Sequence, residues 1–535
     1  MMDSIGEYGR GDPCGRPGNP TDNTGGYGRG DPCGRPETPI SPGNSTDNTG
    51  GYGRGDPCGR PESPTGPCGR SESTGNTVAV VGLGKIGLPL AVQYAMHGRR
   101  IIGCDINPGV VAAVNAGQSH VQEEAELAFE VPRLVKEGLL SATMDTTEAV
   151  RRSRIIVVIV PVVVDAQHEA DFAAIDATTA AIGAGLQPGS LVIYETTLPV
   201  GTTSGRFRRM LERTSGLEAG KDFYLAYSPE RVASGQVFHD LRTYPKVVGG
   251  IDPASLASAE AFYRSVLDAE IITMATAEDA EFVKLIETTY RDVNIALANE
   301  FACYGGMQGL NVTAAIAAAN TQPYSHIHNP GIGVGGHCIP VYPYFLFNDV
   351  EEAELYALNN APLQMLLLPR SARQINDAMA EYAVRMVEET LNSLVGQSVL
   401  ILGAAYRGNV REMAYTSARF IQDALMRHGA SVYVDDPLFD GDELHSQGFT
   451  PFREGLEDEI RAIILQANHQ TYQTFDFSRF PRCQVVFDGR DVLARASIEA
   501  LGMRYLTIGS SSKKVKRVEG SFSLISSTSL AGGFR

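Results

Sequence analysis

The sequence predicts an α/β fold with two doubly wound domains, each a parallel sheet between helices, joined by a central helical region. Three observations lead to this prediction. Short apolar strands alternate with helix-like stretches from Thr77 onward, residues 276–395 are mainly helical in pattern, and a second alternation begins at Val399.

The first 76 of the 535 residues differ from this pattern. They contain 19 Gly and 11 Pro but only 11 apolar residues, too few to offset the entropy of folding, so they predict a disordered tail. The decapeptide YGRGDPCGRP occurs three times, at 8–17, 27–36 and 52–61. A cysteine array for metal or disulfides, an adhesive Arg-Gly-Asp motif and a solvated low-complexity extension are alternative interpretations. The third is favoured because no CxxC pair or His accompanies the cysteines.

The charge and hydropathy of the chain exclude several kinds of partner. The net charge is −17, and 52 of the 62 acidic residues lie after residue 76. An acidic surface repels phosphate backbones, so no nucleic-acid partner is expected. The longest apolar run, residues 155–164, is too short to span a bilayer, and no apolar signal segment lies near the N-terminus. We expect a cytoplasmic protein with reduced cysteines, no membrane partner and no metal site.

A glycine-rich motif follows the first strand, Thr77–Val81, and precedes a helix-like stretch, Leu88–His97. The residues expected to contact a dinucleotide there are Gly82, Gly84, Lys85, Ile86 and Gly87. In such a Rossmann-like motif the first glycine permits a tight turn, the second lets the backbone approach a pyrophosphate, and the third lets the helix pack on the strand. The helix N-terminus favours the negative charge.

The second strand, Arg100–Cys104, ends at Asp105, which lies 18 residues after the last glycine of the motif. A carboxylate there accepts hydrogen bonds from a ribose 2′-OH and repels a 2′-phosphate, so NAD is the expected cofactor.

The remaining expected strands are 155–160, 191–194, 399–402, 431–434, 462–465, 484–487 and 505–508, with a helix over about 415–428.

Residues 280–304 predict a long amphipathic helix. Its apolar stripe consists of Val283, Ile286, Tyr290, Val293, Leu297 and Phe301. Lys284 and Thr288 are four residues apart and therefore share a different face of that helix.

Several segments together resemble the nucleotide-sugar 6-dehydrogenase family, which oxidises UDP-glucose, GDP-mannose and UDP-N-acetylmannosamine. They include VAVVGLGKIGLPLA (78–91), ETTLPVGTT (195–203), YSPERVASG (227–235), AEFVKLIETTYRDVNIALANE (280–300), NPGIGVGGHCIPV (329–341), SARQIND (371–377), LILGAAYRGNV (400–410), VDDP (434–437) and FDGRDVL (487–493). The resemblance covers roughly residues 77–510. It leans toward the N-acetylhexosamine branch, because the PERVASG loop lacks the second Glu of glucose-type loops.

The resemblance implies a domain organisation. The tail (1–76) precedes an NAD-binding Rossmann domain (77–275), a central helical dimerisation region with a catalytic Cys loop (276–395), a C-terminal UDP-sugar-binding Rossmann-like domain (396–510) and a flexible tail (511–535). A homodimer or higher homo-oligomer and a nucleotide-sugar substrate are the expected partners.

The resemblance also implies a four-electron oxidation that supplies uronic acids for surface polysaccharide. Cys338 is the expected nucleophile, Lys284 stabilises oxyanions, Glu230 is the general acid/base, and Thr197 positions water or substrate near the nicotinamide. The expected substrate-binding residues are Glu230, Arg231, Lys284, Gly335, Arg407 and Arg490. An alternative for Glu230 is a loop carboxylate paired with Arg231.

Three positions depart from the family pattern. Thr288 replaces the usual Asn, Tyr342 replaces the usual Asp, and the Arg of a DxRxS element is absent from residues 412–416. A rebuilt water network is the favoured interpretation. A UDP-glucose or GDP-mannose dehydrogenase, a two-electron hydroxy-acid dehydrogenase and a catalytically silent nucleotide-sugar-binding protein are the alternatives.

Overall fold

The computed structural model describes residues 76–165, 167–347 and 365–510. The predicted disorder of residues 1–76 and the predicted flexible tail at 511–535 concern segments that lie outside these ranges, apart from Asn76.

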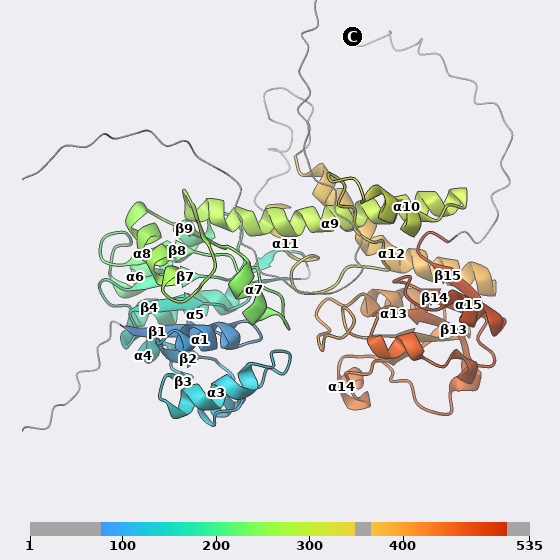
Figure 1. Ribbon diagram of the computed structural model, residues 1–535, viewed down its shortest axis with the longest axis horizontal. Helices are drawn as coiled ribbons and strands as arrows, with labels where there is room; N and C mark the ends of the chain where they lie inside the picture. The colour runs from blue at the N-terminus through green and yellow to red at the C-terminus, as the bar shows by residue number, and fades with distance from the viewer. Residues whose placement is uncertain (1–75, 166, 348–364, 511–535) are drawn as a thin grey trace, which may run out of the picture. The chain divides into compact units, whose positions relative to one another are not determined.

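The first sheet has eight strands in the order β10-β9-β8-β7-β4-β1-β2-β3 (Figure 1). The strands are β1 (Thr77–Val81), β2 (Arg100–Cys104), β3 (Leu140–Thr143), β4 (Ile155–Val158), β7 (Leu191–Tyr194), β8 (Tyr224–Tyr227), β9 (Lys246–Gly250) and β10 (Ile271–Met274). Neighbours from β3 to β8 pair in parallel, which confirms the predicted doubly wound core. One edge of the sheet departs from the parallel pattern, since β9 pairs antiparallel with β8 and parallel with β10.

Helices cover both faces of this sheet because successive strand residues point to opposite sides. Val78 and Val80 belong to one buried cluster, and Ala79 and Val81 to the other. The first cluster is closed by α1 (Gly87–Met96), α3 (Leu127–Lys136), α7 (Val237–Thr243) and α8 (Pro253–Arg264). The second is closed by α4 (Thr146–Arg151), α5 (Ala173–Gly185) and α6 (Arg208–Ser215).

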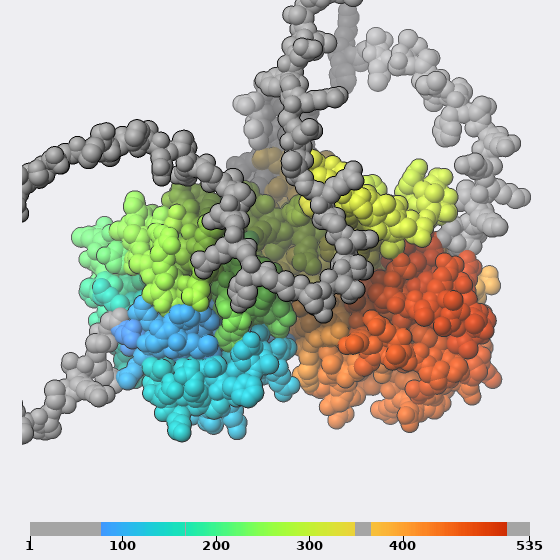
Figure 2. Space-filling model, in the orientation of Figure 1, coloured from blue at the N-terminus to red at the C-terminus, as the bar shows by residue number. Residues whose placement is uncertain are grey.

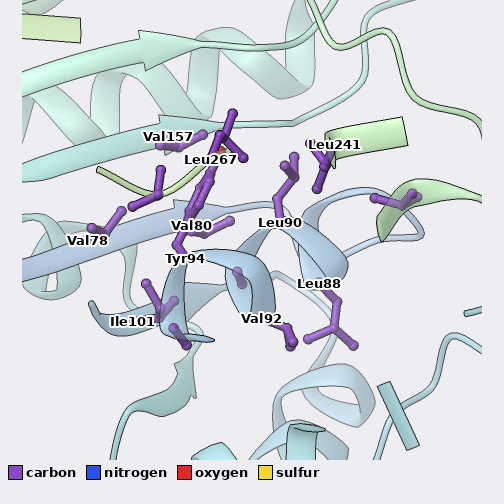
Figure 3. Close-up of a cluster of buried hydrophobic side chains, with 14 of the residues drawn as sticks. Val78, Val80, Leu88, Leu90, Val92, Tyr94, Ile101, Val157, Leu241 and Leu267 are labelled. Carbon is purple, nitrogen blue, oxygen red and sulfur yellow. The ribbon is translucent and has the colours of Figure 1, made fainter. Parts of the chain in front are cut away.

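Helix α1 is packed directly against the central strands. Figure 3 shows its Leu90 and Tyr94 beside Val80, with Leu241 of α7 near Leu90. In the space-filling view, the blue residues of β1 and α1 lie below the green residues of the later strands and helices (Figure 2). Shorter elements of this part are α2 (Pro108–Asn115), the two-stranded β5 (Val163–Val164) and β6 (Ala170–Asp171), and the π-helix η2 (Thr202–Phe207).

The second sheet has five parallel strands in the order β12-β11-β13-β14-β15. They are β11 (Ser398–Leu402), β12 (Ser431–Asp435), β13 (Ile460–Leu465), β14 (Val485–Asp488) and β15 (Arg504–Thr507). The accompanying helices are α13 (Ser417–Arg427), α14 (Gly441–Ser446), α15 (Arg495–Ala500) and the 3₁₀ turns η4 (Glu457–Glu459), η5 (Gln470–Thr474) and η6 (Phe477–Arg479). A second doubly wound unit is therefore confirmed.

In the described residues between the two sheets, helices follow one another in sequence, and the first and last of them are long. They are α9 (Ala277–Gln308), α10 (Val312–Ala319), α11 (Tyr342–Phe347) and α12 (Leu367–Leu391). Figure 1 shows α9 as one unbroken helix. A capping box between Thr276 and Asp279 begins α9, and Gly309, with φ of 68°, ends it. Within the described ranges, every helix is too short or too polar to cross a membrane.

Candidate functional site

The glycine-rich turn between β1 and α1 has the geometry that a dinucleotide site needs. Gly82 adopts φ of +95°, where a side chain would be strained. A Cβ on Gly87 would lie 1.8 Å from the Gly82 oxygen, so the third glycine is required for packing. A Cβ on Gly84 would meet nothing within 4 Å, so this backbone is open to a ligand. Ile86 precedes α1 and packs partly against the first core cluster.

Asp105 holds this turn in place. Its Oδ2 accepts a hydrogen bond from the Leu83 N–H at 2.9 Å, and its Oδ1 accepts one from the Asn107 N–H at 2.9 Å. A carboxylate has about four acceptor positions, so Asp105 keeps acceptor capacity for a ribose hydroxyl.

Lys85 of the glycine-rich turn is engaged by two carboxylates. Its Nζ lies 2.9 Å from Glu123 Oε1 and 3.1 Å from Glu412 Oε2. Burial opposes the charged form, but the two glutamates outweigh it and raise the pKa of Lys85. Glu412 also faces His337 at 3.6 Å. The hydrogen bond from His337, together with Lys85 and against the opposing effect of burial, lowers the pKa of Glu412 to about 2.

Lys284 lies on the buried face of α9. Its ammonium donates to the main-chain oxygen of Glu230 at 2.6 Å. Thr288, one turn later on the same face, is also buried. The structure thus brings Lys284 and Glu230 together, but the contact is with the main-chain oxygen of Glu230 and not with its carboxylate.

The Glu230 carboxylate is largely but not completely buried, with its side chain 11% exposed. Its Oε1 accepts from the N–H groups of Arg231 and Val232, at 2.7 and 3.0 Å, and its Oε2 accepts from Lys246 Nζ at 2.8 Å. Burial works against ionisation, but Lys246 prevails and lowers the pKa of Glu230 to about 2. The Arg231 guanidinium pairs with Glu287 at 2.5 Å, so the alternative of a Glu230–Arg231 ion pair is not what the structure contains.

Sequence reasoning missed Glu195 and Lys246. Lys246 bridges Glu230 and Glu195, whose Oε2 is 2.7 Å from its ammonium. Burial raises the pKa of Glu195 to about 7, although Lys246 opposes the shift. A signal was available: Lys246 opens the apolar strand KVVGG, where a charge requires a partner.

Cys338 follows a glycine-rich loop that packs closely on loops of the second sheet. A Cβ on Gly335 would lie 2.8 Å from the Tyr415 oxygen, and one on Gly336, at φ of +94°, would lie 3.0 Å from the Tyr406 ring. Cys338 is half-buried and carries a free thiol. The glycines therefore allow this loop to approach other backbone.

Tyr342 connects Cys338 with Thr197. Burial and the nearby Cys338 thiol raise the pKa of the Tyr342 phenol, while Thr197 opposes the shift. Thr197 is buried after β7, two residues beyond Glu195. The phenol therefore occupies the position of the usual Asp and stays protonated at neutral pH.

The two candidate arginines of the second sheet differ in exposure. Arg407 is exposed, and its guanidinium lies 5.6 Å from the Tyr406 ring. Arg490 is half-buried, donates from Nε to the Gln466 oxygen at 2.7 Å, and has its pKa lowered to about 10 by burial. A Cβ on Gly331 would lie 2.8 Å from Nη1 of Arg490, so this arginine adjoins the glycine-rich loop that leads to Cys338.

Three adjoining stretches of the chain match models of the UDP-glucose/GDP-mannose dehydrogenase family: its NAD binding domain (76–267), its central domain (278–377) and its UDP binding domain (400–495). A UDP-N-acetyl-D-mannosamine dehydrogenase of Pyrococcus horikoshii is 33% identical over 427 residues, covering 78% of this chain and 96% of that protein. The solved structure of a UDP-D-ManNAc dehydrogenase from the same organism matches with a TM-score of 0.72 at 32% identity, covering 81% of this chain and 99% of that one. A UDP-glucose dehydrogenase structure from Pyrobaculum islandicum matches with a TM-score of 0.72 at 26% identity, covering 82% and 99%.

Proposed function

Since this chain belongs to the UDP-glucose/GDP-mannose dehydrogenase family, it is an NAD-dependent nucleotide-sugar dehydrogenase, and we propose that it oxidises the C6 alcohol of a UDP-N-acetylhexosamine to the carboxylate. The substrate is UDP-N-acetylmannosamine or UDP-N-acetylglucosamine. The observation that carries the proposal is that Cys338 and Tyr342, joined by a backbone hydrogen bond of 2.9 Å, lie close to Thr197 beyond the end of β7, where a thiol can meet the sugar carbon.

The glycine-rich turn fits NAD, because Gly84 leaves its backbone open and Asp105 retains acceptor positions. When bound, NAD would supply the hydride acceptor, and two NAD molecules would be used in succession because two hydrides leave C6. The residues proposed to hold it are Gly82, Gly84, Lys85, Ile86, Gly87, Asp105 and Thr197.

Cys338 is the proposed nucleophile. After the first oxidation its sulfur adds to the C6 aldehyde and gives a thiohemiacetal. The second oxidation converts this adduct to a thioester, and water then cleaves the carbon–sulfur bond to release the carboxylate and the thiol. The half-buried Tyr342 phenol, which lies near Thr197, is proposed to orient the thiol for addition.

Lys284 and Glu230 support these steps from the adjoining loop. The Lys284 ammonium stabilises the oxyanion of each tetrahedral species, a contribution worth about 2.7–4 kcal/mol for one donor. Three of the roughly four acceptor positions of the Glu230 carboxylate are filled, so its Oε2 can still accept a hydrogen bond from the attacking water.

The nucleotide part of the substrate is proposed to bind the loops of the second sheet. Arg407 and Arg490 supply positive charge for the diphosphate, and the backbone of Gly335, which packs against the Tyr415 backbone, contacts the substrate. Arg231 completes the sugar site from the loop that follows β8.

We also propose that the protein forms a homodimer through α9. Four side chains of the predicted stripe, those of Ile286, Tyr290, Leu297 and Phe301, are 41–59% exposed and lie outside the core of this chain, whereas Val283 packs against the second core cluster. A second copy of the same helix would bury them.

The proposed function is tested by counting NADH released per sugar consumed, with UDP-N-acetylmannosamine, UDP-N-acetylglucosamine, UDP-glucose and GDP-mannose in parallel. About two NADH per sugar, abolished by Cys338→Ala, supports the thioester route. One NADH per sugar, or turnover that survives Cys338→Ala, contradicts it. Binding without any turnover would indicate the silent nucleotide-sugar-binding protein.

A further inference from the structure

Lys246 is a buried cation placed between two buried carboxylates. Its side chain is 5% exposed, and its ammonium lies 2.7 Å from Glu195 and 2.8 Å from Glu230. An ammonium without such partners would be strongly unfavourable at this depth, so the three groups depend on one another. Lys246 is the one charged residue of strand β9, whose other residues are apolar or glycine, so the packing of the strand does not require its charge.

The remaining oxygens of this cluster are also occupied. Glu195 Oε1 accepts from the hydroxyls of Tyr94 and Tyr263, at 2.9 and 2.7 Å. Glu230 Oε1 accepts two backbone N–H groups of its own loop. A polar cluster in which every oxygen has a donor is rigid, since any displacement leaves a buried group without a partner.

This cluster fixes the backbone of Glu230 from two sides. The Glu230 carboxylate is tied to Lys246, and the Glu230 N–H donates to the Glu195 main-chain oxygen at 3.2 Å. The Glu230 carbonyl therefore points toward Lys284 and accepts a hydrogen bond from its ammonium at 2.6 Å. Hydrogen bonds thus lead without a gap from Lys246 through Glu230 to Lys284.

We propose that Lys246 is a positioning residue for the oxidation: by anchoring the Glu230 carboxylate, it holds the Glu230 carbonyl that sets the place of the Lys284 ammonium. Glu195 is the second anchor, because it fixes Lys246 from the opposite side. This inference rests on the proposed function of Lys284 at the oxyanion.

The test uses the full chain with Lys246→Met, which keeps the length and removes the charge, Lys246→Arg, which keeps the charge, and Glu195→Gln. Lys221→Met, which breaks an exposed lysine–glutamate pair on the surface, is the matched control. Steady-state kcat and KM are measured with the sugar that the wild type oxidises, and folding is followed by thermal unfolding.

Misplacing a catalytic group by about 1 Å can cost about 10²-fold in rate, so Lys246→Met is expected to lower kcat by about 10²-fold with KM changed less than about threefold. Lys246→Arg should recover most of this loss, and Lys221→Met should change neither value. In a Lys284→Met background, Lys246→Met should add little further loss, because both changes remove the same contribution.

A second readout does not depend on turnover. Labelling of the Lys284 amine by an acylating reagent, followed by peptide mass spectrometry, should be faster in Lys246→Met and Glu195→Gln than in the wild type or in Lys221→Met. An unchanged labelling rate of Lys284 in folded Lys246→Met would overturn the proposal. So would a double variant, Lys246→Met with Lys284→Met, whose loss of kcat equals the product of the two single losses. If Lys246→Met does not fold, Glu195→Gln and Lys246→Arg decide the labelling comparison. A wild type without turnover on any sugar would contradict the proposed function instead, and the labelling result would still test the contact.

Discussion

The Thr288 hydroxyl donates to the main-chain oxygen of Lys284 at 2.9 Å, one turn earlier on α9. A Thr in a helix commonly bonds the carbonyl four residues before it, and its hydroxyl is then satisfied locally. At the position where the family usually has Asn, this chain therefore presents a methyl group and an occupied hydroxyl to the site.

Thr288→Val should consequently have little effect on the reaction. Valine keeps the shape and removes only the bond to the helix, which is worth about 1 kcal/mol of stability. We expect kcat to change less than about threefold, measured by NADH release. A loss of kcat approaching that of Lys284→Met would show that the hydroxyl acts on the substrate or its water.

The glycine-rich turn offers a matched pair of substitutions. Gly87→Ala places a Cβ 1.8 Å from the Gly82 oxygen and should cost about 1–3 kcal/mol of folding free energy, seen as a lower thermal midpoint. Gly84→Ala meets nothing in the protein, so the midpoint should hold while NAD affinity falls, as measured by titration. Unchanged NAD affinity in Gly84→Ala would place the dinucleotide elsewhere.

Glu281 should make stability depend on pH. This buried carboxylate, in α9, accepts N–H groups of Gly201 and Thr203, and burial raises its pKa from 4.5 to about 7. The folded state therefore binds a proton more tightly than the unfolded state. The stabilisation is complete below pH 4.5 and is lost as the pH rises through about 7, on the order of 3 kcal/mol in total.

Glu281→Gln should remove this part of the pH dependence. Denaturant unfolding at pH 5 and pH 8 is expected to show a smaller difference between the two pH values in the variant than in the wild type. Equal differences in both proteins would mean that Glu281 is ionised throughout this range.

The exposed stripe of α9 can be tested without touching the site. Tyr290→Glu puts a charge on a side chain that is 59% exposed, so it should leave the folded chain intact and dissociate the dimer. Phe129→Glu, at an exposed position on α3, is the control. Light scattering after size exclusion measures the mass, and an unchanged mass in Tyr290→Glu would locate the interface elsewhere.

The sequence determined the local elements of this protein, because strand and helix patterns depend on the periodicity of neighbouring residues. The predicted strands 77–81 and 191–194 coincide with β1 and β7, and the glycine-rich turn lies where its motif placed it. The antiparallel edge formed by β9 and β10 was not predicted, because a four- or five-residue apolar run carries no sign of its direction.

Only the tertiary structure decided which charged groups meet. Lys246 lies 16 residues after Glu230 and 51 after Glu195, and no spacing in the sequence relates the three. The order of β7, β8 and β9 in the sheet brings them together, and burial then makes their pairing obligatory. In the same way, the sequence predicted the apolar stripe on α9, but the packing of the chain left most of that stripe exposed, since another face of the helix covers the core and holds Lys284.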